Sequence, residues 1–288
     1  MTVLEVIQRS AAFLAKKGVE SPRLQTEVLL AHLLKLPRMQ LYLKFERALT
    51  PAELDAFRQL VKRRGQREPL QHIVGSVSFC GLEMAADRRA LIPRPETELL
   101  AEQGWAFLNA LSAINHQSSI CLDFGTGAGC LAVTLAVKSP LAFVYALDLS
   151  ADALAVAGQN ASRHGVSERI RFCHGDGFAA IPAQTTFDLI IINPPYIPSG
   201  DILNLEPEVR DFDPRAALDG GADGLDYYRR LAAEAAPFLK PHGKLMLELG
   251  DGQAKSIRAL LEQQKWIVES ILNDYTQRPR MLIARKNE

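Results

Sequence analysis

The stretch that decides the fold is Ile190-Ile191-Ile192-Asn193-Pro194-Pro195-Tyr196. Its β-branched apolar run predicts a buried parallel strand over residues 187–192, because such strands are short and apolar on both faces. Pro194 keeps Asn193 out of helical conformation, and each proline fixes its own φ and lacks an N–H donor. The chain therefore leaves the sheet extended, with Asn193 at the carboxyl end of the strand, where open α/β sheets bind ligands.

The same stretch offers a way to hold a planar nitrogen. The side-chain oxygen of Asn193 and the carbonyl of Pro194 are two acceptors, which match the two hydrogens of an –NH2 group. The ring of Tyr196, beyond Pro195, gives a face on which a planar group can stack. A plain Pro-Pro turn after a core strand is the alternative. We favour a site that presents an amide or amino nitrogen to an electrophile, because the strand that the motif requires is present.

A second motif indicates a nucleotide-like cofactor. Residues 120–124 read as a strand that ends in Asp123-Phe124 and runs into a glycine turn before a helix over residues 130–138. Glycines let the backbone approach a ligand closely, and the helix N-terminus offers N–H groups to an anion. Cys130 stands where the dinucleotide fingerprint has glycine or alanine, so the turn favours S-adenosylmethionine over NAD. The turn consists of Gly125, Thr126, Gly127, Ala128 and Gly129.

Two acids follow later strands. A strand over residues 143–148 ends in Asp148, which we expect to accept both ribose hydroxyls; a helix cap is the alternative. A strand over residues 170–174 precedes Asp176 and Phe178. We expect Asp176 to accept the adenine amino group and Phe178 to pack on the ring, with a plain turn as the alternative.

Composition narrows the class of protein. The chain has 288 residues, 48% of them hydrophobic, which is enough for a full core and predicts two domains. It carries 33 basic and 33 acidic residues, a balance that argues against a duplex-DNA binder. The sequence contains no run of about 18 apolar residues, so no membrane span is predicted and we expect a soluble cytoplasmic protein. The six histidines lack ligand spacing, and no metal is predicted.

The pattern along the chain predicts three parts. Residues 1–70 read as a helical substrate-recognition domain, 71–90 as a β-hairpin linker, and 91–288 as an α/β domain. The basic cluster at residues 62–67 complements a helix C-terminus; a contact to an acidic protein or to RNA is the alternative. The long loop over residues 197–223 is predicted to cover a substrate site.

Taken together, these motifs resemble the release-factor glutamine methyltransferase family of class I S-adenosylmethionine-dependent methyltransferases. The resemblance covers nearly the whole chain. Amino-methyltransferases acting on adenine share Asn-Pro-Pro-Tyr, so the other segments narrow the family. The segments that carry it are Ile92-Pro93-Arg94-Pro95-Glu96-Thr97-Glu98, Asp123-Phe124-Gly125-Thr126-Gly127-Ala128-Gly129, Asn193-Pro194-Pro195-Tyr196-Ile197 and Glu208-Val209-Arg210-Asp211-Phe212-Asp213-Pro214-Arg215.

The resemblance implies a fold, a reaction and a set of residues. The fold is a Rossmann-like seven-stranded methyltransferase domain with an antiparallel last strand. The reaction is methyl transfer from S-adenosylmethionine to the amide nitrogen of the glutamine in the Gly-Gly-Gln motif of peptide-chain release factors. A ribosomal-protein glutamine or an adenine amino group in nucleic acid is the alternative substrate. We expect a monomer with no membrane contact and no stable nucleic-acid binding.

Residue roles follow by position in the motifs. Catalysis is assigned to Asn193, Pro194 and Tyr196, and substrate binding to these residues with Pro195. Near the C-terminus the family often has glycine in the turn where this chain has Gln277, which affects the expected turn shape and not the chemistry. The residues assigned to cofactor binding are Asp123, Gly125, Thr126, Gly127, Gly129, Asp148, Asp176, Phe178 and Asn193.

Overall fold

The computed structural model describes residues 1–287. The chain divides into two compact units. The smaller unit contains Met1–Ser76 together with Glu206–Phe212, and the larger contains Val77–Leu205 and the residues from Asp213 onwards. Glu206–Phe212 therefore belongs with the N-terminal helices, although more than a hundred residues of sequence separate them.

The smaller unit is helical, as predicted. Thr50 caps one helix with a capping box, in which its hydroxyl accepts from the Glu53 N–H and the Glu53 carboxylate accepts from the Thr50 N–H. Leu14, Leu29 and Phe57 are almost fully buried in its core. The helices are α1 (Val3–Lys16), α2 (Pro22–Leu34), α3 (Arg38–Tyr42), α4 (Pro51–Gly65), α5 (Leu70–Val74) and α9 (Pro207–Arg210).

Arginines of the basic cluster at residues 62–67 form ion pairs inside this unit. Arg64 is 3% exposed and donates to Glu208 Oε1 at 2.6 Å. Arg67 donates to Glu208 at 2.6 Å and to Glu206 at 2.7 Å. The segment Glu206–Phe212 is thus tied to the end of α4 by charge.

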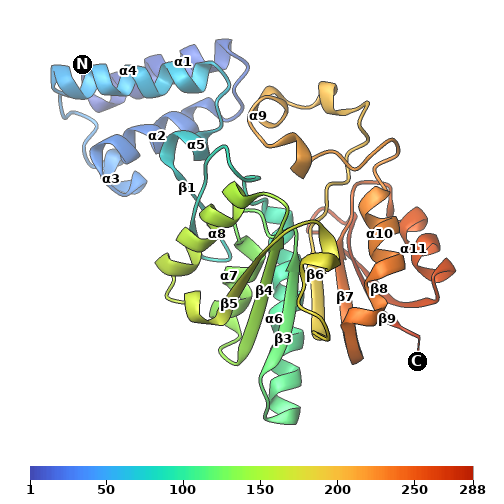
Figure 1. Ribbon diagram of the computed structural model, residues 1–288. Helices are drawn as coiled ribbons and strands as arrows, with labels where there is room; N and C mark the ends of the chain where they lie inside the picture. Colours follow the sequence, from blue (N-terminus) through green and yellow to red (C-terminus); the bar gives the residue numbers. More distant parts are fainter. Residues whose placement is uncertain (288) are drawn as a thin grey trace. The chain divides into compact units, whose positions relative to one another are not determined.

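The larger unit contains a seven-stranded sheet that is flanked by helices (Figure 1). A short hairpin, β1 (Ser76–Phe79) and β2 (Leu82–Ala85), precedes it in the chain. The strands of the sheet are β3 (Ser119–Phe124), β4 (Ala142–Asp148), β5 (Ile170–His174), β6 (Phe187–Ile192), β7 (Leu239–Glu248), β8 (Trp266–Asn273) and β9 (Pro279–Lys286). The main helices are α6 (Pro95–Asn115), α7 (Cys130–Lys138), α8 (Ala151–Arg163), α10 (Asp226–Glu234) and α11 (Ala254–Gln263).

The topology places the ends of the central strands together. The strand order is β5-β4-β3-β6-β7-β9-β8, and β9 runs antiparallel to both of its neighbours, β7 and β8. This confirms the predicted seven-stranded methyltransferase fold with an antiparallel last strand. Asp123 on β3 pairs with Ala146 on β4 and with Ile191 on β6. In this register Asp123, Asp148 and Asn193 all reach the same edge of the sheet.

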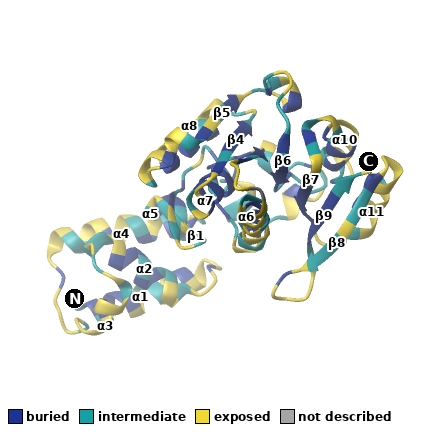
Figure 2. Ribbon diagram, turned by 90° about the horizontal axis from the view of Figure 1, so that it is seen from below, coloured by how far each residue is buried: buried dark blue, intermediate teal, exposed yellow. Residues whose placement is uncertain are grey.

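Alternate residues of each central strand face opposite layers of helices. Ile191 packs with the buried residues of α6 and α7, whereas Ile190 and Ile192 pack with those of α10 and α11. The central strands are accordingly drawn dark blue, as buried, in Figure 2. Burial on both faces explains why residues 189–192 form a continuous apolar run within β6.

Two local expectations need correction. The predicted hairpin over residues 71–90 is confirmed but shorter, because Leu70–Val74 forms the helix α5 and Gly75 ends it with φ +83°. The turn at Gln277 does not need a glycine to form: Gln277 itself adopts a left-handed φ of +65°.

Candidate active site

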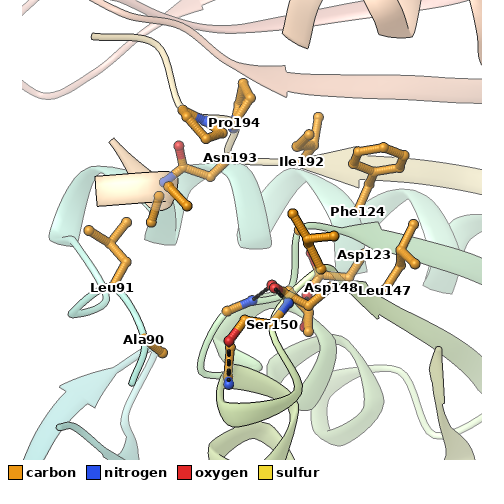
Figure 3. A pocket seen from close by; sticks show the side chains of 18 of the residues that line it. Ala90, Leu91, Asp123, Phe124, Leu147, Asp148, Ser150, Ile192, Asn193 and Pro194 are labelled. Carbon is orange, nitrogen blue, oxygen red and sulfur yellow. Dashed lines mark hydrogen bonds between the residues drawn. The ribbon is translucent and has the colours of Figure 1, made fainter. Parts of the chain in front are cut away.

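A pocket of about 320 Å³ opens at the carboxyl ends of β3, β4, β5 and β6, entirely within the larger unit. This volume lies in the range of pockets that hold small molecules. Asn193 and Pro194 lie on one side of it, and Asp148 and Ser150 lie across from them (Figure 3). The pocket therefore brings together the two motifs that the sequence singled out.

The glycine turn after β3 forms one wall. Gly125, Gly127 and Gly129 have φ values of +75°, +54° and +79°, a conformation that side chains with a Cβ rarely adopt. A Cβ on Gly129 would lie 2.8 Å from the Cβ of Ala157, so the third glycine also allows α7 and α8 to pack closely. Thr126 lines the pocket as well.

Asp123, at the end of β3, stabilises the glycine turn by hydrogen bonds. It is fully buried, and its Oδ2 accepts from the Thr126 hydroxyl at 2.6 Å and from the Ala132 N–H at 3.0 Å. Its Oδ1 is buried and has no hydrogen-bond partner in the described chain. Burial raises the pKa of Asp123 to about 7, against the lowering effect of these hydrogen bonds. One carboxylate oxygen is thus left for a donor that enters the pocket.

Asp148 joins the ends of β3 and β4. Its Oδ2 accepts from the Gly127 N–H and its Oδ1 from the Ser150 N–H, both at 2.8 Å. Each oxygen of a carboxylate can accept a second hydrogen bond. Asp148 therefore shapes the glycine turn and retains acceptor capacity on the pocket wall.

Asp176 and Phe178, which the sequence assigned together, are separated by the structure. Asp176 lines the pocket and pairs with Arg230, another lining residue. Phe178 is 4% exposed and does not line the pocket; its ring stacks on Phe238 at 4.5 Å between centroids. The expectation that Phe178 packs on a cofactor ring is therefore corrected, because apolar neighbours in the core bury it.

Asn193 is oriented by a neighbouring helix. Its Nδ2 donates to the Thr97 hydroxyl at 2.9 Å, which leaves the amide oxygen pointing elsewhere. Pro194 and Pro195 line the pocket beside it. Tyr196 does not line this pocket. Its ring packs against the core beneath, and burial raises its pKa to about 12. Tyr196 instead lines a second pocket, together with Leu225 and Gly250, and its stacking role stays a prediction.

Sequence reasoning missed Glu248, at the end of β7. It is 1% exposed and its Oε2 accepts from the Thr97 hydroxyl at 2.6 Å. Burial raises the pKa of Glu248 to about 7, while the Thr97 hydrogen bond lowers it. The signal in the sequence was an acid inside the apolar run Leu245-Met246-Leu247-Glu248-Leu249. Such a residue needs a buried partner.

Arg94 is held at the pocket by a buried acid. It pairs with Asp213, whose side chain is fully buried and also accepts from the Ile92 N–H at 3.4 Å. Burial raises the pKa of Asp213, and the Arg94 charge opposes this rise. The Arg94–Asp213 pair holds the second half of the loop over residues 197–223 at the pocket. Pro214, Ala216 and Ala217 of this half line the pocket.

Two kinds of feature are absent from the described residues. Among residues 1–287, no helix is long and apolar enough to cross a membrane. In the same residues no group of three or more histidine, cysteine or acidic side chains is arranged to hold a metal ion.

Comparisons with known proteins agree with this arrangement. A family model described as the PrmC N-terminal domain matches residues 5–75, and one described as a methyltransferase small domain matches residues 103–204. The release factor glutamine methyltransferase of Geobacter sulfurreducens is 45% identical over 91% of this chain and 89% of its own length. That of Chlorobaculum tepidum is 44% identical over 98% of this chain and 96% of its own.

Solved structures share the fold at low identity. A methyltransferase from Pyrococcus furiosus matches with a TM-score of 0.53 and 20% identity, over 73% of this chain and 92% of that one. The N-terminal domain of human METTL16 in complex with SAH also matches with a TM-score of 0.53, at 15% identity over 72% of this chain and 77% of that one.

Proposed function

Since the chain belongs to the release factor glutamine methyltransferase family, it is a methyltransferase, and we propose that its methyl donor is S-adenosylmethionine and its acceptor the glutamine of the Gly-Gly-Gln motif in peptide-chain release factors. The observation that carries the proposal is the Asn193 amide: Asn193 lines the pocket, and because its Nδ2 donates to the Thr97 hydroxyl, its oxygen is left to accept from a substrate. Because the proposed substrate works on ribosomes, we expect the reaction to take place in the cytoplasm.

The pocket residues fit this cofactor. Asp123 Oδ1, buried and without a partner, suits the ammonium group of an amino acid. The remaining acceptor sites of Asp148 suit a ribose diol, and the turn at Gly125 and Gly127 has no Cβ to obstruct a close approach. Bound S-adenosylmethionine supplies an electrophilic methyl group on a sulfonium centre. Asp176 lies on the same wall, already paired with Arg230, and we keep it as a candidate contact.

Asn193 and Pro194 hold the glutamine amide in this proposal. The side-chain oxygen of Asn193 accepts one N–H of the amide and the carbonyl of Pro194 accepts the other. An amide nitrogen is a weak nucleophile, because its lone pair is delocalised into the carbonyl. Accepting both hydrogens raises electron density on the nitrogen and fixes the amide plane. Alignment of this kind is worth on the order of 7 kcal/mol or more in favourable cases.

The chain needs no general base for this step. Methyl transfer makes the nitrogen cationic and strongly acidic, so its proton leaves to water. An adenine amino group has the same pair of hydrogens, which is why Asn-Pro-Pro-Tyr alone does not choose the substrate. The basic cluster at residues 62–67 was the sequence feature that favoured nucleic acid, and Arg64 and Arg67 are paired with acids of the chain.

A labelled-methyl assay tests the proposal. Release factor, its Gly-Gly-Gln glutamine-to-alanine variant, ribosomal protein and RNA are offered in parallel, and only the first should accept label. Asn193→Ala should lower kcat by on the order of 100-fold and leave S-adenosylhomocysteine affinity unchanged. Asn109→Ala is the matched control, because it removes an exposed amide from the same unit. Near-normal turnover in Asn193→Ala, or label on the glutamine-free factor, would refute the proposal.

A further inference from the structure

Three side chains from three elements form a line of hydrogen bonds behind the pocket. Glu248, at the end of β7, accepts from the Thr97 hydroxyl in the first turn of α6 at 2.6 Å. Thr97 in turn accepts from Asn193 Nδ2, after β6, at 2.9 Å. Thr97 and Glu248 are each 1% exposed, so water does not replace these bonds.

We propose that Glu248 is a positioning residue that acts through Thr97 to keep the Asn193 oxygen, and not its –NH2 group, facing the substrate. The proposal rests on the assignment of Asn193 as an acceptor for the substrate amide. It adds to that assignment the two residues that fix which end of the asparagine amide is presented.

The direction of the hydrogen bonds follows from counting hydrogens. An ionised carboxylate only accepts, and a hydroxyl has a single hydrogen to donate. Thr97 therefore gives its hydrogen to Glu248 and can only accept from Asn193. That requirement turns Nδ2 of Asn193 toward Thr97 and its oxygen away. A protonated Glu248 can donate instead, which allows Thr97 to donate to the Asn193 oxygen and brings the –NH2 group round to face the substrate.

The reversed arrangement cannot hold the substrate. Two –NH2 groups facing each other are donors without an acceptor, and an unpaired polar group in a closed site is unfavourable. Turnover should therefore follow the ionisation of Glu248. The direction of one buried hydroxyl thus becomes a condition for catalysis.

The surroundings of Glu248 bring its ionisation near neutral pH. Burial raises the pKa of Glu248 to about 7, and the Thr97 hydrogen bond opposes this. Arg280 on β9 and Arg94 before α6 favour the charged form, whereas Glu96 on α6 disfavours it. The polar side chains of Tyr196 and Tyr228 also lie within electrostatic reach, and the Tyr228 hydroxyl donates to the main-chain oxygen of Glu248.

The first experiment compares two substitutions at one position. Thr97→Val removes the hydroxyl and keeps the shape, so kcat on release factor should fall on the order of 10- to 100-fold. Thr97→Ser keeps the hydroxyl and should recover kcat to within about threefold. S-adenosylhomocysteine affinity should be unchanged in both variants, since Asp123 and Asp148 are untouched. Equal kcat in the valine and serine variants would overturn the proposal.

The second experiment is a pH profile at saturating cofactor. Saturation is needed because burial also raises the pKa of Asp123 to about 7, and its protonation would affect cofactor binding. Wild-type kcat should be about tenfold lower at pH 6 than on its alkaline plateau, as expected for a group with a pKa of about 7. Glu248→Gln should remove this pH dependence between pH 6 and 8.5, because glutamine does not titrate. A Glu248→Gln profile with the wild-type slope would overturn the proposal.

A third readout needs no substrate and separates this proposal from the proposed function. The side-chain 15NH2 signals of Asn193, assigned with Asn193→Ala, should shift between pH 8.5 and 6 in the wild type and stay constant in Glu248→Gln. Signals that move equally in both proteins would reject the coupling to Glu248. Absence of methylation of release factor by the wild type, with the expected NMR titration, would instead reject the substrate assignment.

Discussion

Glu248→Gln should make the larger unit more stable than the wild type at alkaline pH. Burial raises the pKa of Glu248 from 4.5 to about 7, so the folded protein keeps a proton that the unfolded chain releases between these values. The folded state therefore loses stability relative to the unfolded state as pH rises through this window. The full pKa shift corresponds to roughly 3 kcal/mol of folding stability, which the wild type loses as Glu248 ionises. The Glu248→Gln variant does not lose it, because glutamine stays neutral.

The quantity to measure is how the difference in free energy of unfolding between Glu248→Gln and the wild type changes with pH. From these pKa values, the advantage of Glu248→Gln over wild type should grow by about 2 kcal/mol between pH 5.5 and 8.5. Asp123 titrates in both proteins and cancels in the comparison. Any effect of the substitution that does not depend on pH cancels between the two pH values.

Urea unfolding followed by tryptophan fluorescence suits this measurement. Both tryptophans, Trp105 on α6 and Trp266 on β8, lie in the larger unit, so the signal reports the unit that contains Glu248. Glu262→Gln is the control, since it neutralises a half-exposed carboxylate of α11 in the same unit and should show almost no such change. If Glu248→Gln and the wild type differed in free energy of unfolding by the same amount at pH 5.5 and 8.5, burial would not raise the pKa of Glu248, and this reasoning would be refuted.

Three further predictions concern the cofactor wall, a turn and the smaller unit. Asp148→Ala should weaken S-adenosylhomocysteine binding on the order of tenfold or more in calorimetry, and an unchanged Kd would reject the ribose assignment. Gln277→Gly should raise the free energy of unfolding by about 1 kcal/mol, because the residue has φ +65°; a loss in urea unfolding would show that its side chain matters more. Arg67→Ala should speed amide exchange in Glu206–Phe212 roughly 5- to 30-fold by mass spectrometry, and exchange as slow as in the exposed-pair control Arg58→Ala would argue against the ion-pair tie.

The sequence predicted the sheet well, because local patterns define its strands. The bounds of β6 agree with the strand predicted over residues 187–192, because its apolar residues 189–192 are buried on both faces and prolines follow directly. The glycine turn was found for a similar reason, as three glycines after a strand are compatible with few structures. Such features depend on residues that are adjacent in the sequence.

Side-chain directions beyond the strand ends could not be predicted in the same way. Phe178 follows Asp176 closely, yet its ring is buried against Phe238, and Tyr196 follows Asn193 closely, yet it lines a different pocket. Proximity in sequence to Asp176 and Asn193 was an insufficient guide to a role in the pocket. The Thr97–Glu248 hydrogen bond joins residues 151 positions apart, and the Arg64–Glu208 bond joins residues 144 apart. No local pattern specifies such partners.

The hydrogen-bond line also explains why an asparagine suits position 193. Aspartate would present acceptors to both the substrate and Thr97, so the single hydrogen of the Thr97 hydroxyl would be contested by two carboxylates, one of them the buried Glu248. A second charge beside Glu248 would also raise the cost of burying either one. Serine would provide a donor and acceptors but not the reach or the planar geometry of an amide. Among these side chains, only an amide donates to Thr97 through its nitrogen and accepts from the substrate through its oxygen in one plane. The choice of asparagine at position 193 therefore follows from the charge of Glu248, which Thr97 links to Asn193 through two hydrogen bonds.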